Sequence, residues 1–316
     1  MPFLIIIAIF LLVGTALLTN PIKVRSMVIN TKADPARLEA DVKALTGLPG
    51  YRCFERPDDL DRAADWAKAE LMTSGLPVEE QSFGAGDRSF RIFIAHYGLE
   101  EGPVLVIGAH YDVCGEQPGA DDNASAVAGL LELARLLDRH QPEVAHRLEL
   151  VLWPLEEPPN FRTPAMGSAV HANALALRGA EVRGMISLEM IGYFSDEKGS
   201  QSFPAPGMSL LYSSRGDSIV VVGNSSSWWF TRRVKTRMAG STQLPVRSIN
   251  APAFVPGIDF SDHLNFWHEG WNAVMITDTA FYRNPNYHEV TDTPDTLDYE
   301  RMAQVVTGVY AAITTL

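Results

Sequence analysis

The chain contains little cysteine. Among its 316 residues the only cysteines are Cys53 and Cys114, too few for a disulfide framework. One bridge and two free thiols both remain possible. The two residues lie 61 positions apart and outside any CxxC motif, so the sequence disfavours metal binding by thiolates.

Positive charge is also scarce. The chain has 26 Lys and Arg against 38 Asp and Glu, a net charge of −12, and no basic stripe, which argues against a nucleic acid partner. The run RRVKTR, from Arg232 to Arg237, is short and typical of one helix face. Hydrophobic residues make up 46% of the chain and charged residues 20%, which indicates a folded globular protein.

Charge is missing altogether from Phe3 to Leu18, a run of sixteen residues. This run is long for the core of a signal peptide and slightly short for a membrane span. No Lys or Arg precedes it, whereas Lys23 and Arg25 follow, so the charges do not define an N-in orientation. A buried first helix is the alternative. We expect residues 1–25 to be a secretory signal or membrane anchor, and residues 35–316 to act outside the cytoplasm, secreted or membrane-anchored, in the periplasm if the source is bacterial.

Apolar spacing predicts alternating helices and strands. Helical spacing covers about 35–74, the segment after Asp122, a stretch around 229–238 and about 299–313. Strands are expected at 90–97, 104–109, 148–155, 185–191, 219–222 and 274–277. This alternation predicts an α/β three-layer sandwich with a mostly parallel, mixed central sheet. Residues 195–206 and 224–256 are expected to be long excursions that wall the active site.

Polar residues follow the predicted strands where ligands gather in such sheets, beyond the carboxyl ends. His110 and Asp112 end one apolar run and Asp122 follows a glycine-rich turn. The glutamates Glu156 and Glu157 end another run, and Glu189 interrupts a third. Carboxylates clustered away from water are costly unless a cation offsets their charge.

Five residues are candidate metal ligands: His110, Asp122, Glu157, Glu189 and His288. Two imidazoles and three carboxylates suit Zn²⁺, and two ions sharing one carboxylate account for the number of ligands. Paired zinc ions lower the pKa of a bridging water, so a bridging hydroxide would be the nucleophile. Glu156 adjoins a ligand without being needed as one, and we expect it to be the general base.

Each signal also has a structural interpretation. Asp122 and Asn123 could cap the following helix, and adjacent glutamates are most often solvent-exposed. His288 could be a surface histidine. Glu189, within MISLEM, is the hardest to explain without a partner, because unpaired buried carboxylates are rare. The set as a whole favours a metal site.

The chain resembles the co-catalytic zinc aminopeptidase family, whose relatives include glutamate carboxypeptidases and glutaminyl cyclases. The resemblance covers about residue 38 to the end, and its segments are GAHYD (108–112), PGADDNAS (118–125), LEE (155–157), SLEM (187–190), SDHLNFW (261–267) and RNPNYHEVTDTPDTLDYE (283–300). It implies a zinc-peptidase fold of the phosphorylase/hydrolase-like type and two zinc ions per chain.

The resemblance also implies roles. His110 and Glu189 resemble the ligands of one zinc, Glu157 and His288 those of the other, and Asp122 the bridging carboxylate. Further matches lie outside the ligand set: Asp112 resembles the carboxylate that orients the first histidine, Ser261 the partner of the last histidine, and Tyr287 a tyrosine that stabilises the oxyanion.

Three positions depart from the family pattern. Glu189 stands where the family often has Asp, and Ala126 replaces a usual Gly. PPNFRTPAMGS (158–168) differs from the common E-x-G pattern, which puts the loop beside the base in question.

We therefore expect an aminopeptidase that removes N-terminal residues from peptides with a free N-terminus. The alternatives are a glutaminyl cyclase and a non-catalytic receptor-type homologue. Trp228, Trp229 and Phe230 are interpreted either as a side-chain pocket or as core.

Overall fold

The apolar runs of the sequence form the middle of one mixed sheet. The computed structural model describes residues 13–22, 25–27 and 29–316. The strands are β1 (Val78–Ala85), β2 (Arg88–Gly98), β3 (Val104–His110), β4 (Arg147–Trp153), β5 (Val182–Glu189), β6 (Ile219–Gly223), β7 (Val246–Asn250) and β8 (Ala273–Thr277). Their order across the sheet is β1-β2-β4-β3-β5-β8-β6-β7.

The four central strands, β4, β3, β5 and β8, run parallel to one another. Antiparallel pairing occurs toward the edges, between β1 and β2, β2 and β4, and β8 and β6. The carboxyl ends of the central strands therefore meet at one edge of the sheet, where ligands bind in folds of this class. The predicted mostly parallel, mixed sheet is confirmed.

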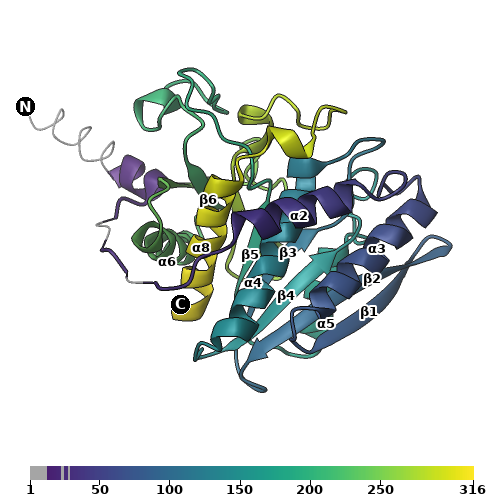
Figure 1. The fold of residues 1–316 in the computed structure, drawn as a ribbon. Helices are drawn as coiled ribbons and strands as arrows, with labels where there is room; N and C mark the ends of the chain where they lie inside the picture. The colour runs from purple at the N-terminus through teal and green to yellow at the C-terminus, as the bar shows by residue number, and fades with distance from the viewer. Residues whose placement is uncertain (1–12, 23–24, 28) are drawn as a thin grey trace, which may run out of the picture.

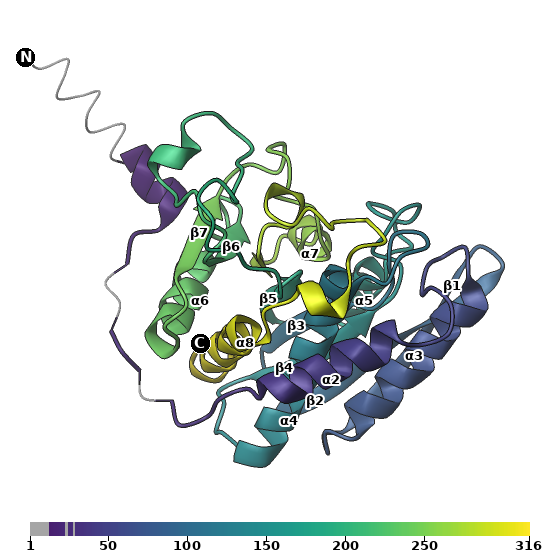
Figure 2. The ribbon, with the colours of Figure 1, turned by 45° about the horizontal axis from the view of Figure 1, so that its top comes forward.

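Helices cover both faces of the sheet (Figures 1 and 2). They are α2 (Pro35–Thr46), α3 (Pro57–Met72), α4 (Ala126–His140), α5 (Gly167–Leu177), α6 (Trp228–Ser241), α7 (His263–His268) and α8 (Tyr299–Thr315). The apolar faces of α2, α3, α4, α6 and α8 share one core with the sheet. On the other face, α5 and α7 pack on a second core that contains Trp153 and Phe266. The predicted three-layer sandwich is confirmed.

Gly108 shows how tightly the central strands are covered. A Cβ at this position of β3 would lie 2.0 Å from the ring of Trp153, which the neighbouring strand β4 carries. Only glycine leaves room for the indole. The glycine of GAHYD thus serves packing directly beneath the strand end that presents His110.

Several elements differ from the prediction. The helical stretch 35–74 is two helices, α2 and α3, because the chain leaves the helix at Gly47 and re-enters it at Pro57. Strands β1 and β7 and helices α5 and α7 were not predicted, since they are short, edge-located or, like α5, without a clear apolar stripe. Trp228, Trp229 and Phe230 do not line the cavity described below; Phe230 packs in the core, whereas Trp229 is 70% exposed.

The predicted signal or anchor lies partly outside the described residues, which begin at residue 13. Residues 13–19 are helical, and the chain after them lies against α6: the Lys235 ammonium donates to the carbonyls of Thr19 and Asn20. Within the described part of the chain, no helix combines the length and apolarity needed to cross a bilayer. The division into a segment 1–25 and a domain 35–316 stays a prediction.

Candidate active site

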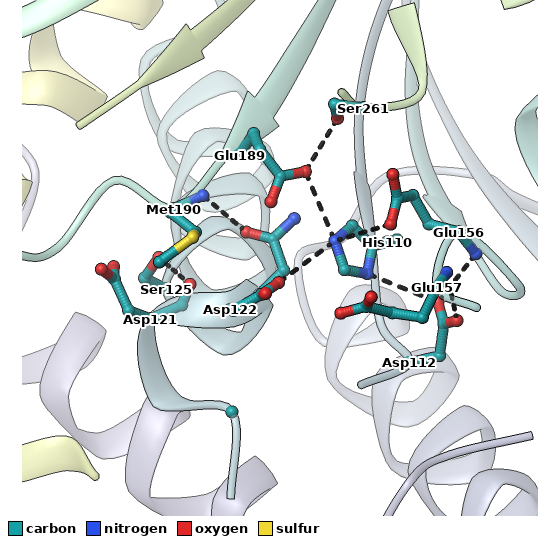
Figure 3. Close-up of polar contacts among 12 residues, drawn as sticks. His110, Asp112, Asp121, Asp122, Ser125, Glu156, Glu157, Glu189, Met190 and Ser261 are labelled. Carbon is teal, nitrogen blue, oxygen red and sulfur yellow. Dashed lines mark hydrogen bonds and ion pairs between the residues drawn. The ribbon is translucent and has the colours of Figure 1, made fainter. Parts of the chain in front are cut away.

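His110 is the last residue of β3, and its side chain is fully buried at the carboxyl edge of the sheet. Its Nδ1 lies 3.4 Å from Asp112 Oδ1. Its Nε2 faces three carboxylates, at 3.3 Å from Glu189 Oε2, 3.5 Å from Asp122 Oδ1 and 3.8 Å from Glu156 Oε2 (Figure 3). The imidazole thus points one nitrogen at an orienting carboxylate and the other into an acidic cluster.

Asp112 also fixes the two glutamates that follow β4. Its Oδ1 accepts a hydrogen bond from the backbone N–H of Glu156 at 3.2 Å, and its Oδ2 accepts one from that of Glu157 at 3.1 Å (Figure 3). Both glutamates are buried, as the apolar run before them predicts. Asp112 therefore fixes the backbone at Glu156 and Glu157, immediately before the segment 158–168 that departs from the family pattern.

Asp122 lies in a short distorted helical segment, Ala120–Ser125, that precedes α4. It does not cap α4, which begins at Ala126, so the capping interpretation is wrong. Its own N–H donates to Asp292 at 3.0 Å, and the guanidinium of the buried Arg52 donates to the carbonyls of Pro118 and Gly119. These contacts direct the Asp122 carboxylate between the two histidines.

Glu189 is the last residue of β5, whereas the sequence pattern placed it inside a strand. Its Oε2 accepts a hydrogen bond from Ser261 Oγ at 2.7 Å, and Ser261 is 2.9 Å from Ser187 Oγ. Ser261 was expected beside His288 and instead contacts Glu189. The physical reason is the pleat: Ser187 and Glu189 are two residues apart on β5 and face the same side, where Ser261 precedes α7.

His288 approaches from the opposite side of the cluster. Its Nε2 lies 3.1 Å from Asp122 Oδ2 and 3.4 Å from Glu157 Oε2. The backbone is left-handed at this residue, with φ at 58°, and the ring stacks on Tyr287 at 3.8 Å. Tyr287 itself lines the adjoining cavity. The strained backbone and the stacked ring aim the imidazole inward, away from the surface position that the sequence left open.

The five candidate ligands therefore converge, with Asp122 shared between two groups. Oδ1 of Asp122 faces His110, beside Glu189, while Oδ2 faces His288, beside Glu157. Ligand atoms of His110, Asp122 and Glu157 all lie within 4.8 Å of one another. The same holds for Cys114, Glu157 and His288, so a thiol lies beside two of the candidate ligands. Cys53 and Cys114 are both free thiols.

Several buried donor and acceptor atoms of the cluster lack a hydrogen-bond partner among the described residues. They are His110 Nδ1 and Nε2, Asp122 Oδ1 and Glu157 Oε1. Buried polar atoms are almost always satisfied, and leaving one unpaired costs about 1–3 kcal/mol. A cation bound in the cluster would satisfy His110 Nε2, Asp122 Oδ1 and Glu157 Oε1, whereas His110 Nδ1 faces Asp112.

The pKa shifts within the cluster also indicate a cation site. Burial raises the pKa of Glu157 to about 8 and that of Glu156 well above its usual range. Burial opposes the charged form of His288, but its hydrogen bonds, above all that to Asp122, raise its pKa to about 12. The imidazole driven to accept a proton indicates excess negative charge, and neighbouring carboxylates add to the effect of burial on the two glutamates.

A cavity of about 240 Å³ adjoins the cluster. Asp122, Glu156, Glu157, Glu189 and His288 lie at one end of it. Most of its remaining wall is apolar, including Met208, Val220, Val222, Ile249, Ile258 and Met275. Residues from both predicted excursions line it, Phe203 from the first and Pro256 from the second, as expected.

Sequence reasoning missed several residues that support the site. Arg52 and Asp292 hold the backbone before and at Asp122, and Asp262 adds a fully buried carboxyl group whose pKa burial raises to about 7. Asp262 adjoins Ser261 in SDHLNFW, so its position beside a quoted motif was a usable signal. Arg52 stands 70 residues before Asp122 in a stretch with no motif, and nothing local marks it.

Comparison with known proteins agrees with this geometry. The chain is 47% identical to the uncharacterized protein YfbL of Escherichia coli (strain K12) over 285 residues, which cover 88% of this chain and 87% of that protein. It is 24% identical to leucine aminopeptidase 1 of Trichophyton rubrum over 280 residues, 82% of this chain and 69% of that one.

Solved structures share the fold. The LapA aminopeptidase of Legionella pneumophila superposes with a TM-score of 0.70 at 19% identity, covering 89% of this chain and 72% of that chain. A glutaminyl cyclase of Bacteroides thetaiotaomicron bound to N-acetylhistamine superposes with a TM-score of 0.69 at 17% identity, covering 90% and 99%. These likenesses show the fold alone.

A family model decides the classification. The model described as peptidase family M28 matches residues 94–313, a range that contains all five candidate ligands and Glu156. It thereby covers more than half of the chain and every segment that presents a side chain to the cluster. The protein belongs to peptidase family M28.

Proposed function

We propose that the protein is a zinc-dependent aminopeptidase that removes N-terminal residues from peptides. The observation that carries the proposal is the shared carboxylate: Asp122 presents one oxygen to His110 and the other to His288, and the buried atoms around it lack partners. Family membership supports peptide hydrolysis, and the aminopeptidase among the relatives supports the exopeptidase mode.

The donor set fits two zinc ions. His110, Glu189 and one oxygen of Asp122 would hold the first, and Glu157, His288 and the other oxygen of Asp122 the second. When bound, two zinc ions polarise the scissile carbonyl and make a hydroxide available near neutral pH. Asp112, 3.4 Å from Nδ1 of His110, would keep the ligating nitrogen of that ring deprotonated and aimed at the metal.

Glu156 is placed to move protons. Its carboxylate reaches within 3.8 Å of His110 Nε2 and lines the cavity, while its backbone N–H is held by Asp112. It would take a proton from the attacking water and deliver it to the leaving amine nitrogen. Tyr287 also lines the cavity and stacks on His288. Its hydroxyl would donate a hydrogen bond to the developing oxyanion.

The cavity indicates which N-terminal residues fit. Its apolar wall would accept an apolar side chain, and the carboxylates at its metal end would hold the ammonium group of the substrate. We therefore expect peptides with a free N-terminus and a medium-sized apolar first residue to be the best substrates.

The main alternative is a glutaminyl cyclase, which the fold similarity keeps open. Two measurements on one purified sample separate the proposals: metal content per chain, and turnover of a panel of aminoacyl anilides beside an N-terminal glutaminyl peptide. We expect about two zinc ions and release of anilines from apolar residues. Cyclisation of the glutaminyl peptide without anilide hydrolysis would reject the aminopeptidase. Metal binding without turnover of either substrate would favour a receptor-type homologue.

The location of the enzyme is part of the proposal. An apolar, uncharged run from Phe3 to Leu18 supports export or membrane anchoring, so that the peptidase acts outside the cytoplasm. Fractionation of the source cells, with mass determination of the mature N-terminus, tests both points. Recovery of the full chain from the cytoplasm would reject them.

A further inference from the structure

Cys114 lies beside the group that would hold the second zinc. It follows His110, the end of β3, by four residues and is half-buried. Its Sγ, a carboxylate oxygen of Glu157 and a ring nitrogen of His288 all lie within 4.8 Å of one another. The thiol is not part of a disulfide. A thiol, a carboxylate and an imidazole from three separate segments therefore lie close together.

A second, independent observation supports a metal-binding role for this thiol. Glu157 is only 4% exposed, and its Oε1 has no hydrogen-bond partner among the described residues. Its Oε2 already faces His288 at 3.4 Å. An unpaired oxygen buried this deeply requires a cation or a donor, and the thiol sulfur lies within 4.8 Å of a carboxylate oxygen of the same residue.

We propose that the Cys114 thiolate is an additional ligand of the metal ion held by Glu157 and His288. The proposal deepens the metal centre proposed above and rests on it. On binding, the S–H bond breaks, the proton passes to bulk water and a sulfur–metal bond forms. Bonds of about 2.0–2.3 Å in a tetrahedron place donor atoms about 3.3–3.8 Å apart, which a small closure of this cluster achieves.

The two metal positions would then differ in the number and type of their protein ligands. Asp122, Glu157, His288 and Cys114 would supply four protein ligands to the second ion, one more than the first ion has, and five-coordination would leave room there for the bridging hydroxide. His110, Glu189 and Asp122 supply three ligands to the first ion and leave a position open for substrate. The thiolate also makes the second position selective for soft or borderline ions over Mg²⁺ and Mn²⁺.

Cobalt spectroscopy tests the proposal without reference to activity. The full chain is stripped of metal and loaded with Co²⁺, and its near-ultraviolet absorption is recorded with metal content. We expect a sulfur-to-cobalt charge-transfer band in the wild type, and its loss in Cys114→Ser. Cys53→Ser is the matched control, since Cys53 is the other thiol and is buried elsewhere at 1% exposure; it should keep the band. Two bound cobalt ions without the band, or a band that persists in Cys114→Ser, would overturn the proposal.

Alkylation of the wild type gives a second measurement that needs no variant. The rate of carboxymethylation at Cys114, mapped by mass spectrometry, should fall by about tenfold or more when Zn²⁺ saturates the protein. Equal rates with and without bound Zn²⁺ would overturn the proposal. A protein that binds no metal at all would reject the proposed metal centre itself, so the two failures are distinguishable.

Discussion

Buried carboxylates lie near both ends of strand β4, and the charges that surround them differ. Near its start, Glu149 is fully buried with His171 at 3.1 Å and Arg147 at 3.2 Å, and Arg178 lies 3.8 Å away. Beyond its other end, Glu156 and Glu157 join Asp122 and Glu189 around two histidines. In the first group one carboxylate faces three basic side chains, whereas in the second four carboxylates share two imidazoles.

The pKa directions follow this difference. Burial alone would raise the pKa of Glu149, but its hydrogen bond with His171 and the nearby cationic groups lower it. Burial raises the pKa of Glu156 and Glu157, and neighbouring carboxylates add to the effect. A buried carboxylate matched by the protein itself is structural, whereas one left unmatched requires something from outside. That contrast locates the functional end of the sheet.

The largest expected effect is at the unmatched end. Glu156→Gln removes the proton-accepting group while preserving the shape of the side chain. We expect peptidase activity to fall by about 10³-fold or more, because no other group replaces the proton transfer. Zinc content and thermal midpoint should stay near those of the wild type. Near-normal turnover would mean that Glu156 is not the base.

The same change at the matched end should act on stability instead. Glu149→Gln removes the charge that pairs with His171 and Arg147, and breaking a buried ion pair costs about 3 kcal/mol of unfolding free energy. Urea denaturation measures this cost, while kcat of the folded fraction should be unchanged. If activity fell with stability intact, the two ends of β4 would be coupled and the contrast would be wrong.

The smallest expected effect is the pH dependence of the free energy of unfolding, measured in chelator. The pKa of Glu157, about 8, and that of His288, about 12, both exceed their ordinary values, so the folded chain binds more protons than the unfolded chain. The free energy of unfolding should therefore fall as pH rises from about 5 to 8. Denaturation at several pH values in chelator measures the slope.

Two controls accompany that slope. Glu157→Gln removes one of the titrating groups and should flatten it. Saturating zinc should reverse it, because the ligands must lose their protons to bind the metal, which favours the folded state as pH rises. A chelated wild type whose stability increases over this pH range would contradict the excess of negative charge.

Much of the fold could be predicted because buried segments have recognisable apolar patterns in the sequence. Strands β3 and β8 are nearly continuous apolar runs and β4 and β5 are rich in apolar residues, as expected for parallel strands covered on both faces. Strand β1, which alternates between exposed and half-buried positions at the edge of the sheet, and helix α5, which has little apolar asymmetry, leave weaker traces and were missed.

The candidate site shows the same division. His110, Glu156, Glu157 and Glu189 were identifiable because each ends or follows an apolar run. Ser261 was assigned to the wrong partner, since its contact depends on where the start of α7 packs and not on sequence order. Helix α7 packs against β5 and β8, and this packing brings Ser261, just before the helix, to Glu189.

The amino-acid sequence by itself determined the class of fold and the chemistry of the ligands, because apolar period and residue type are local properties. Only the tertiary structure decided that Cys114 lies near His288, that Arg52 supports the turn before Asp122, and that many distant segments wall one apolar cavity. Those contacts join residues tens to hundreds of positions apart, and their geometry follows from strand order and helix packing, which no local pattern encodes.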